Sequence, residues 1–265
     1  MTWSYSRINS YDQCPKMFYM QYIDRAESLD SAFGQWGSLC HSILDDYAKG
    51  KYLEFELGDV YEERYPEYMT ERFPPNKYVD LNASYYDKGK EYFDDFEGFP
   101  ENWEIIGSEQ KIKIEIDGIK VRGFIDLIVR DKNDGRIIVV DHKSKAKFKN
   151  DEELEHSGYQ LYFYAIWVYE NLGEWPKELL FNMFRIGDVK RINFSQHGLA
   201  KAKAWLKENV EKIYNDDDFL DKVERDNLKK DKKSKEKNSY PDFFCQYLCS
   251  VRHHCERSGL YVEEM

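Results

Sequence analysis

The first hundred residues show the apolar spacing of helices. Short helices are expected within residues 1–24, with a break at Cys14-Pro15. Residues 34–37, Gly-Gln-Trp-Gly, are predicted to form a loop, and a helix is expected from Ser38 onward. Residues 51–100 mix charged and aromatic residues, which indicates amphipathic helices with solvated charged faces.

The middle of the chain has the two-residue period of strands. Apolar and charged residues alternate towards the end of residues 103–116, and Asp117-Gly118 is typical of a hairpin turn. β-branched residues then fill residues 123–130 and 136–143, joined by a polar turn. The remaining predictions are helices at 150–172 and 195–214, a strand at 179–185, and a flexible or solvated lysine-rich tract at 222–238.

Two of these strands carry an acid where a buried strand should be apolar. Asp126 lies within Phe-Ile-Asp-Leu-Ile, and Asp141 ends Ile-Ile-Val-Val. Lys143 follows Asp141 by two residues, so the two side chains share a face. Two acids brought together repel, and Mg²⁺ or Mn²⁺ would relieve that repulsion, activate water and neutralise a phosphoryl oxygen. The alternative is that both acids lie at strand ends and pair with Lys143 or Arg122.

Four further polar residues are less easily assigned. His41 lies on a predicted helix, where a lone histidine is more often structural than a ligand. Gln160 and Tyr164 share one face of a helix that is apolar nearly all round, so the glutamine needs a partner. Glu109 could join the acids, but a surface position is expected for it.

Residues 241–255 hold three closely spaced cysteines, Cys245, Cys249 and Cys255. In a reducing compartment, such a group usually binds a metal ion or an iron–sulfur cluster instead of forming disulfides. Three thiolates leave one ligand position open. The candidates for it are Cys14, Cys40, His253 and His254. A structural zinc site that uses a histidine is the alternative.

Composition places the chain among globular proteins. It has 265 residues, 42% of them hydrophobic, which is enough for a sizeable core. We find neither a membrane span nor a signal peptide, so a cytoplasmic location is expected, or the host cytoplasm if the chain is phage-encoded. The net charge of −11 argues weakly against a nucleic-acid partner, although it leaves room for a local basic groove.

Taken together, the two acid-bearing strands, the Asp141-x-Lys143 spacing and the cysteines resemble the RecB-like branch of the PD-(D/E)XK nucleases. The chain is most similar to the iron–sulfur members, such as the AddB nuclease domain, the CRISPR-adaptation exonucleases and phage-encoded relatives. The resemblance implies an α/β fold: a restriction-endonuclease-like core with a central mixed sheet flanked by helices, and a helical iron–sulfur cap formed by both termini. It also implies a single nuclease domain over residues 1–265, made of an N-terminal helical part (1–100), the catalytic sheet and helix (101–190), and C-terminal helices with the cysteine cluster (191–265).

The resemblance also implies roles for individual residues. Gly37-x3-His41, Gly123-x-x-Asp126 and Asp141-x-Lys143 match the family's motifs for its metal ligands and lysine. The implied ligands of Mg²⁺ or Mn²⁺ are His41, Asp126, Asp141 and the main-chain carbonyl of His142. Lys143 would position or activate water, and Gln160-x3-Tyr164 would orient Lys143 or the DNA. The implied ligands of a [4Fe–4S] cluster are Cys14, Cys245, Cys249 and Cys255.

The expected function is therefore that of a metal-dependent DNA nuclease, acting as an exonuclease on single strands or duplex ends in recombination, repair or phage DNA metabolism. No G-x4-G-K-[ST] motif is present, so the protein would act alone or with a partner helicase or recombination protein. Two alternatives stay open: a module that binds DNA ends or a partner without cleaving, and an RNA-directed nuclease. The sequence leaves the oligomeric state open.

Overall fold

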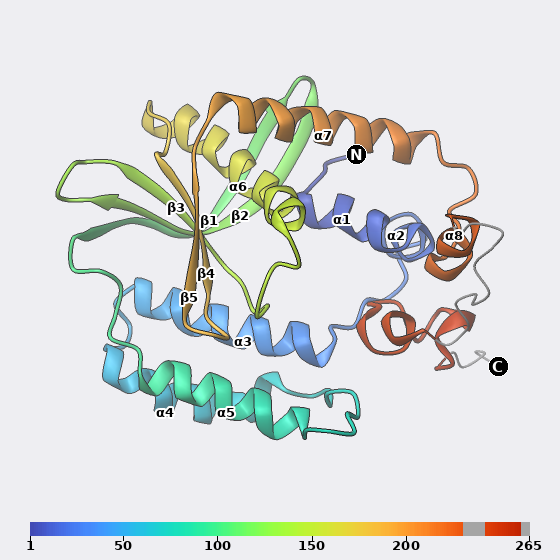
Figure 1. The fold of residues 1–265 in the computed structure, drawn as a ribbon, viewed down its shortest axis with the longest axis horizontal. Helices are drawn as coiled ribbons and strands as arrows, with labels where there is room; N and C mark the ends of the chain where they lie inside the picture. Colours follow the sequence, from blue (N-terminus) through green and yellow to red (C-terminus); the bar gives the residue numbers. More distant parts are fainter. Residues whose placement is uncertain (230–241, 261–265) are drawn as a thin grey trace.

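The computed structural model describes residues 1–229 and 242–260. A central sheet lies between two groups of helices (Figure 1). One group contains α1 (Tyr5–Gln13), α6 (Asp151–Leu172) and α7 (Gln196–Tyr214). The other contains α3 (Ala32–Ala48), with α4 (Leu57–Tyr68) and α5 (Leu81–Asp94) packed behind it. The sheet and its flanking helices confirm the predicted α/β fold.

In the described part of the chain, the sheet has five strands in the order β1-β2-β3-β4-β5. Their bounds are Trp103–Ile116, Ile119–Asp131, Ile137–His142, Glu178–Met183 and Asp188–Asn193. All neighbouring pairs are antiparallel except β3 and β4, which run parallel and are joined through α6. The sheet is therefore mixed. Helix α6 connects β3 to β4 and packs on one face of the sheet.

β1 and β2 form a long hairpin that extends beyond the rest of the sheet. β3 pairs with residues 127–130 of β2 only, so residues 119–126 have no neighbour in β3. Trp3 occupies part of that free edge: its N–H donates to the Lys120 carbonyl at 2.8 Å, and its carbonyl accepts from the Arg122 N–H at 2.8 Å. The start of α1 is thereby fixed beside the end of β3.

Two apolar clusters hold the layers together. The larger one joins the inner face of the hairpin to α6 and α7, and includes Trp3, Ile112 and Phe163. The second lies among α3, α4 and α5 and is built on Trp36 and Tyr61, both fully buried. The Trp36 indole N–H donates to the Tyr61 hydroxyl at 2.9 Å, which satisfies a polar group inside an aromatic core.

Short helices connect and complete these layers. α2 (Pro15–Tyr22) follows α1 directly, and α8 (Lys222–Lys229) follows α7. The remaining short helices are η1 (Glu54–Glu56), η2 (Phe244–Leu248) and η3 (Glu256–Ser258). No helix in the described ranges is both long and apolar enough to cross a membrane.

Three local predictions differ from the structure. Residues 34–37 lie inside α3. Ser31 caps the helix by accepting from the Gly34 N–H, and burial of the Trp36 side chain stabilises the helix more than Gly34 and Gly37 destabilise it. Strand β5 was not predicted. Residues 222–229 of the lysine-rich tract form α8, and residues 230–238 lie outside the described residues.

Candidate active site

Two buried carboxylates lie where β3 ends. Asp126 is 9% exposed and Asp141 is 2% exposed. The Asp126 Oδ2 accepts a hydrogen bond from the His142 N–H at 2.6 Å, which ties the end of β3 to β2. Burial, and after it the charge of Asp141, raises the pKa of Asp126 well above its ordinary value. The two predicted acids therefore share one low-dielectric site, and their charges oppose each other.

Lys143 is held from two sides. Its Nζ lies 2.7 Å from Asp141 Oδ2 and donates to Gln160 Oε1 at 3.2 Å. The Gln160 side-chain amide in turn donates to the Tyr164 hydroxyl. This chain of contacts crosses from β3 to α6 and gives the buried glutamine the partners that it requires. Within the described residues, Asp141 Oδ2 is buried and accepts no well-oriented hydrogen bond, so it keeps a lone pair for another ligand.

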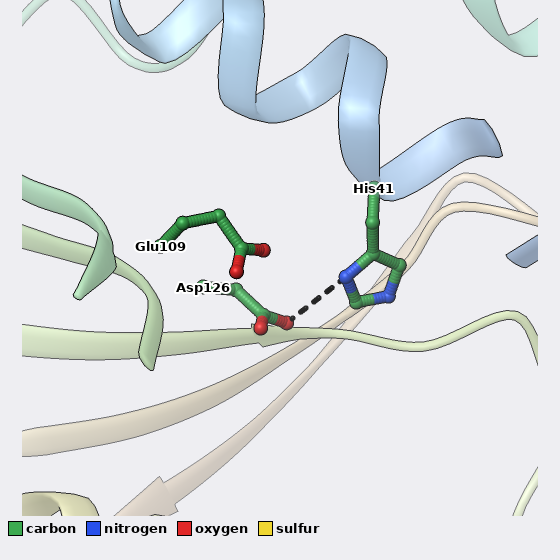
Figure 2. Close-up of side chains that lie close together, drawn as sticks. All are labelled: His41, Glu109 and Asp126. Carbon is green, nitrogen blue, oxygen red and sulfur yellow. Dashed lines mark ion pairs between the residues drawn. The ribbon is translucent and has the colours of Figure 1, made fainter. Parts of the chain in front are cut away.

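His41, Glu109 and Asp126 converge from α3, β1 and β2 (Figure 2). Each offers one ligand atom, and these atoms all lie within 4.8 Å of one another. The His41 Nδ1 lies 3.5 Å from Asp126 Oδ2. Burial lowers the pKa of His41, which favours the neutral imidazole that binds metal ions.

Glu109 is half-buried in this group, so the expected surface position was wrong. Ser108 pairs with Leu127 and Gln110 with Ile125, which leaves Glu109 opposite Asp126. Its φ of +46° is unusual for a residue other than glycine, and such backbone is often found at functional sites. Burial raises the pKa of Glu109, and the charge of Asp45 adds to the effect.

A signal for Glu109 was present in the sequence. Counting back from the Asp117-Gly118 turn pairs residue 116 with 119, 112 with 123 and therefore 109 with 126. Both turn residues have positive φ, as a two-residue hairpin turn requires. The turn thus predicts the register, and the register predicts the neighbour of Asp126.

The donors fit a hard divalent cation. Carboxylate oxygens with one neutral imidazole suit Mg²⁺ or Mn²⁺, and the cation would offset the repulsion between two buried acids. The main chain of His142 also reaches this centre through its N–H to Asp126. Its imidazole points elsewhere, with Nδ1 3.0 Å from the Asn182 amide nitrogen. Burial lowers the pKa of His142 well below its ordinary value, so that ring is neutral.

All seven residues predicted for catalysis and metal binding line one cleft of about 700 Å³. They are His41, Asp126, Asp141, His142, Lys143, Gln160 and Tyr164. The cleft opens where β2 runs on beyond β3 and is bounded by α1, α3 and α6. The structure therefore brings together residues that span more than 120 positions of the sequence.

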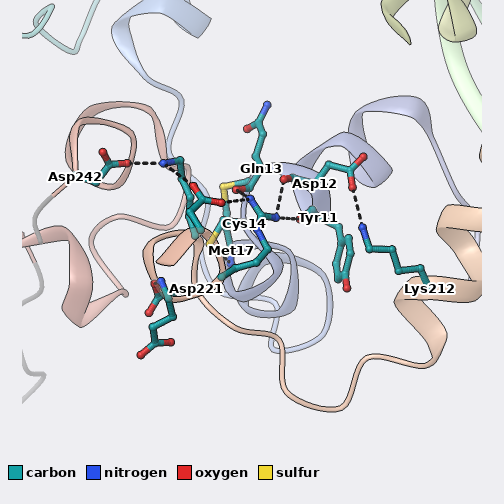
Figure 3. Close-up of polar contacts among 12 residues, drawn as sticks. Tyr11, Asp12, Gln13, Cys14, Met17, Lys212, Asp221 and Asp242 are labelled. Carbon is teal, nitrogen blue, oxygen red and sulfur yellow. Dashed lines mark hydrogen bonds and ion pairs between the residues drawn. The ribbon is translucent and has the colours of Figure 1, made fainter. Parts of the chain in front are cut away.

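The four cysteines assigned to a cluster do not line this cleft. Cys14 separates α1 from α2, and its sulfur accepts from the Met17 N–H at 3.4 Å (Figure 3). Cys14, Met17 and Cys249 pack together. Burial, with added repulsion from the other thiols, raises the pKa of Cys245 and of Cys249 to about 12.

The other candidates for the fourth ligand lie differently. Cys40 is fully buried in the separate cluster among α3, α4 and α5, and His253 is exposed. His254 is half-buried. Hydrogen bonds also join the two ends of the chain: Leu29 N–H donates to the Ser250 carbonyl at 2.8 Å, and Arg252 donates to the Leu29 carbonyl at 3.1 Å.

Comparison with known proteins places this geometry in a family. No curated protein sequence matches the chain significantly. A candidate exonuclease from Eubacterium rectale has a similar crystal structure, with a TM-score of 0.47, 16% sequence identity and 80% of each chain covered. The sequence model of the PD-(D/E)XK nuclease superfamily matches residues 2–256, which include the whole sheet and every candidate site residue. The chain therefore belongs to the PD-(D/E)XK nuclease superfamily.

Proposed function

We propose that this protein is a metal-dependent deoxyribonuclease, an exonuclease that hydrolyses phosphodiester bonds in single strands or at duplex ends. The observation that carries the proposal is the cleft in which two buried carboxylates, a neutral histidine and a fixed lysine meet. Membership of a nuclease superfamily supports phosphodiester hydrolysis as the reaction. We treat residues 1–265 as one nuclease domain, working alone or with a helicase or recombination partner.

The metal ligands would be His41, Asp126, Asp141 and the His142 carbonyl, with Glu109 added by the geometry. A bound Mg²⁺ or Mn²⁺ supplies Lewis-acid chemistry, because it polarises a phosphoryl oxygen and lowers the pKa of a coordinated water. The protein's part is to hold these donors in a fixed arrangement. The His142 N–H to Asp126 bond does this by locking the end of β3 against β2.

Lys143 is the residue that we propose to position the attacking water. Its ammonium is held between Asp141 and Gln160, so it can orient a water or stabilise charge on the phosphoryl oxygens without rearranging. Tyr164 fixes the amide of Gln160 and acts on Lys143 indirectly. Burial raises the pKa of Tyr164 well above its ordinary value, so its hydroxyl stays protonated.

A module that binds DNA without cleaving is the weaker explanation. Burying several ionisable side chains is costly, and a module that only binds gains nothing from a buried acid pair beside a lysine. The retained set of His41, Asp126, Asp141 and Lys143 therefore favours cleavage.

We further propose that Cys14, Cys245, Cys249 and Cys255 hold a [4Fe–4S] cluster with a structural role. After burial, the charges of Cys14 and Cys255 raise the pKa of both Cys245 and Cys249, so these four thiols lie near one another, which supports a shared site. The cluster would cross-link segments far apart in sequence, as the hydrogen bonds between Leu29 and residues 250–252 already do.

The deciding experiment is a digestion assay on anaerobically purified protein. The substrates are end-labelled single- and double-stranded DNA, a covalently closed circle and a labelled RNA, each with Mn²⁺, Mg²⁺ or a chelator. We expect metal-dependent loss of linear DNA, with a drop of about 10²- to 10³-fold in Lys143→Ala because the fixed ammonium is lost. Lys145→Ala is the matched control, since Lys145 pairs with Glu153 at 2.9 Å and does not line the cleft.

Each substrate tests a different part of the proposal. Cleavage of the closed circle would overturn the exonuclease assignment in favour of an endonuclease. Digestion of RNA alone would overturn the assignment to DNA. Metal-loaded protein that binds DNA ends yet leaves every substrate intact would replace the nuclease proposal with the binding module.

A further inference from the structure

One wall of the catalytic cleft is basic, although the whole protein has a net charge of −11. Three cations that the proposed chemistry does not use line it: Arg7 from α1, Lys111 from β1 and Arg122 from β2. Phe124, also on β2, lines the same wall. Asp126 and Asp141 line the same cleft, so these cations lie beside the proposed site of cleavage.

The guanidinium of Arg7 is held in place. It donates to the Thr2 carbonyl at 2.6 Å and lies 4.3 Å from the centre of the Tyr22 ring. Stacking on an aromatic ring leaves the guanidinium's other N–H donors available. Arg7 is therefore oriented by the protein without being neutralised.

Arg122 places a second positive charge next to the first. Its backbone N–H donates to the Trp3 carbonyl, so the pairing of Trp3 with β2 brings the two arginines together. Burial lowers the pKa of Arg7, and the charge of Arg122 lowers it further. Within the described ranges, neither arginine has a carboxylate partner. Two like charges held together without a counter-ion favour an anionic ligand, and guanidinium groups match the geometry of phosphate.

Phe124 presents an apolar surface beside these charges. Its side chain is 51% exposed, whereas the neighbouring Ile125 is fully buried. Lys111 lies directly opposite Phe124 in the β1–β2 register and is exposed as well. An exposed aromatic ring interleaved with cations is the arrangement on which unpaired bases stack while the backbone is neutralised.

A second cavity beside the metal-ligand group differs from the cleft in its charged residues. This cavity, of about 570 Å³, shares His41, Asp126 and Ser144 with the cleft. Its lining contains Asp45 and Glu109 and, among the described residues, no lysine or arginine. Among the described residues, a polyanion therefore meets lining cations in the cleft and none in this second cavity.

We propose that Arg7, Arg122 and Lys111 bind backbone phosphates of a single DNA strand on one side of the scissile bond, while Phe124 stacks on one of its bases. This inference rests on the proposed nuclease function and adds the strand's position to it. Because the protein binds the strand on only one side of the scissile bond, the product on the other side is free to dissociate. This arrangement suits removal of short pieces from an end.

The test measures binding apart from cleavage. Fluorescence anisotropy with a labelled 20-nucleotide single strand, in chelator and again in Ca²⁺, gives Kd over a range of salt concentrations. Arg122→Gln is expected to weaken binding about tenfold and to reduce the slope of log Kd against log[salt] by about 0.7, the value for one lost phosphate contact to a single strand. Phe124→Ala is expected to weaken binding roughly five- to hundredfold with the slope unchanged, because stacking releases no counter-ions.

Arg72→Gln is the matched control, since Arg72 is exposed and lies outside the cleft. If Arg122→Gln showed the same Kd and the same salt slope as Arg72→Gln, the phosphate-binding wall would be overturned, whatever the cleavage activity. Salt-dependent binding that Arg122→Gln weakens, in a protein that cuts nothing with Mn²⁺, would overturn cleavage and leave the wall standing. Wild-type protein that binds no single strand would overturn the wall, whatever the digestion assay shows for duplex DNA.

Discussion

Glu109 shows how a single residue enters the centre through backbone geometry. Its side chain lies opposite Asp126 because the hairpin register places it there, and its φ of +46° turns it towards His41 (Figure 2). Replacing such a residue therefore tests a ligand, while the register around it stays fixed by many backbone hydrogen bonds.

We expect Glu109→Gln to weaken metal binding and slow cleavage by about 10- to 100-fold, which corresponds to about 1.4–2.7 kcal/mol. The reason is that the amide removes a charge from the donor set without changing its size. A titration of activity against Mn²⁺ concentration checks this, with recovery expected at high Mn²⁺.

Glu104→Gln, an exposed change on the same strand, serves as the control for Glu109→Gln. If Glu109→Gln required no more Mn²⁺ than the wild-type protein, Glu109 would be a neighbour of the metal site and not a ligand.

At the scale of elements, α4 and α5 touch through a glycine. A Cβ atom added to Gly89 would lie 2.3 Å from the Tyr61 ring. That ring cannot move aside easily, because Tyr61 is fully buried and its hydroxyl bonds both Trp36 and the Tyr85 carbonyl. Close approach of these two helices thus depends on the absence of one side chain.

We therefore expect Gly89→Ala to destabilise the fold by about 1–3 kcal/mol through overpacking, even though alanine favours a helix. Gly34→Ala in α3 is the matched control: its Cβ would meet Asp30 at an ordinary 3.6 Å, so a gain of about 0.5–1 kcal/mol is expected. Thermal unfolding of both variants measures the difference. Equal melting temperatures would contradict the close packing of α4 and α5.

Much of the element pattern could be predicted because its signals are local. The β-branched runs that became β2 and β3, and the apolar helix that became α6, depend on neighbours two to four residues away. The helical state of residues 34–37 depends instead on the burial of Trp36 against Tyr61, 25 positions later. β5 has only two apolar residues among polar ones, so its pairing with β4 and not its sequence makes it a strand.

The candidate site divides in the same way. Asp126 and Asp141 stand out because charge inside a strand is unusual, and Lys143 follows Asp141 by two residues. Glu109 lies among other charged residues of a half-exposed strand. Only its position opposite Asp126 on β2 distinguishes it from them. The pairing of Arg7 with Arg122 could not be predicted from local pattern, since it depends on Trp3 completing the edge of β2.

At the scale of the whole molecule, the proposed cluster joins the two ends of the chain. Cys249→Ser is expected to remove the brown colour of an iron–sulfur protein and to lower the melting temperature, because an alkoxide is a poorer ligand for iron than a thiolate. Cys40→Ala is the control, as Cys40 is buried in a different cluster. Absorbance, iron content and thermal unfolding of anaerobic protein check this together. A soluble Cys249→Ser protein with full iron content would exclude Cys249 as a ligand.

The contact between Leu29 and Arg252 also has a consequence for synthesis. These residues are 223 positions apart, so a ribosome that adds about 5–20 residues per second makes the second roughly 11–45 s after the first. Every residue assigned to the catalytic centre has left the ribosome before then, since Tyr164 is the last of them. Contact between these two segments can therefore form only after every residue assigned to the catalytic centre has been synthesised. With the proposed cluster at this junction, a shortage of iron or sulfide would weaken the contact between the two segments after the catalytic residues have already been made.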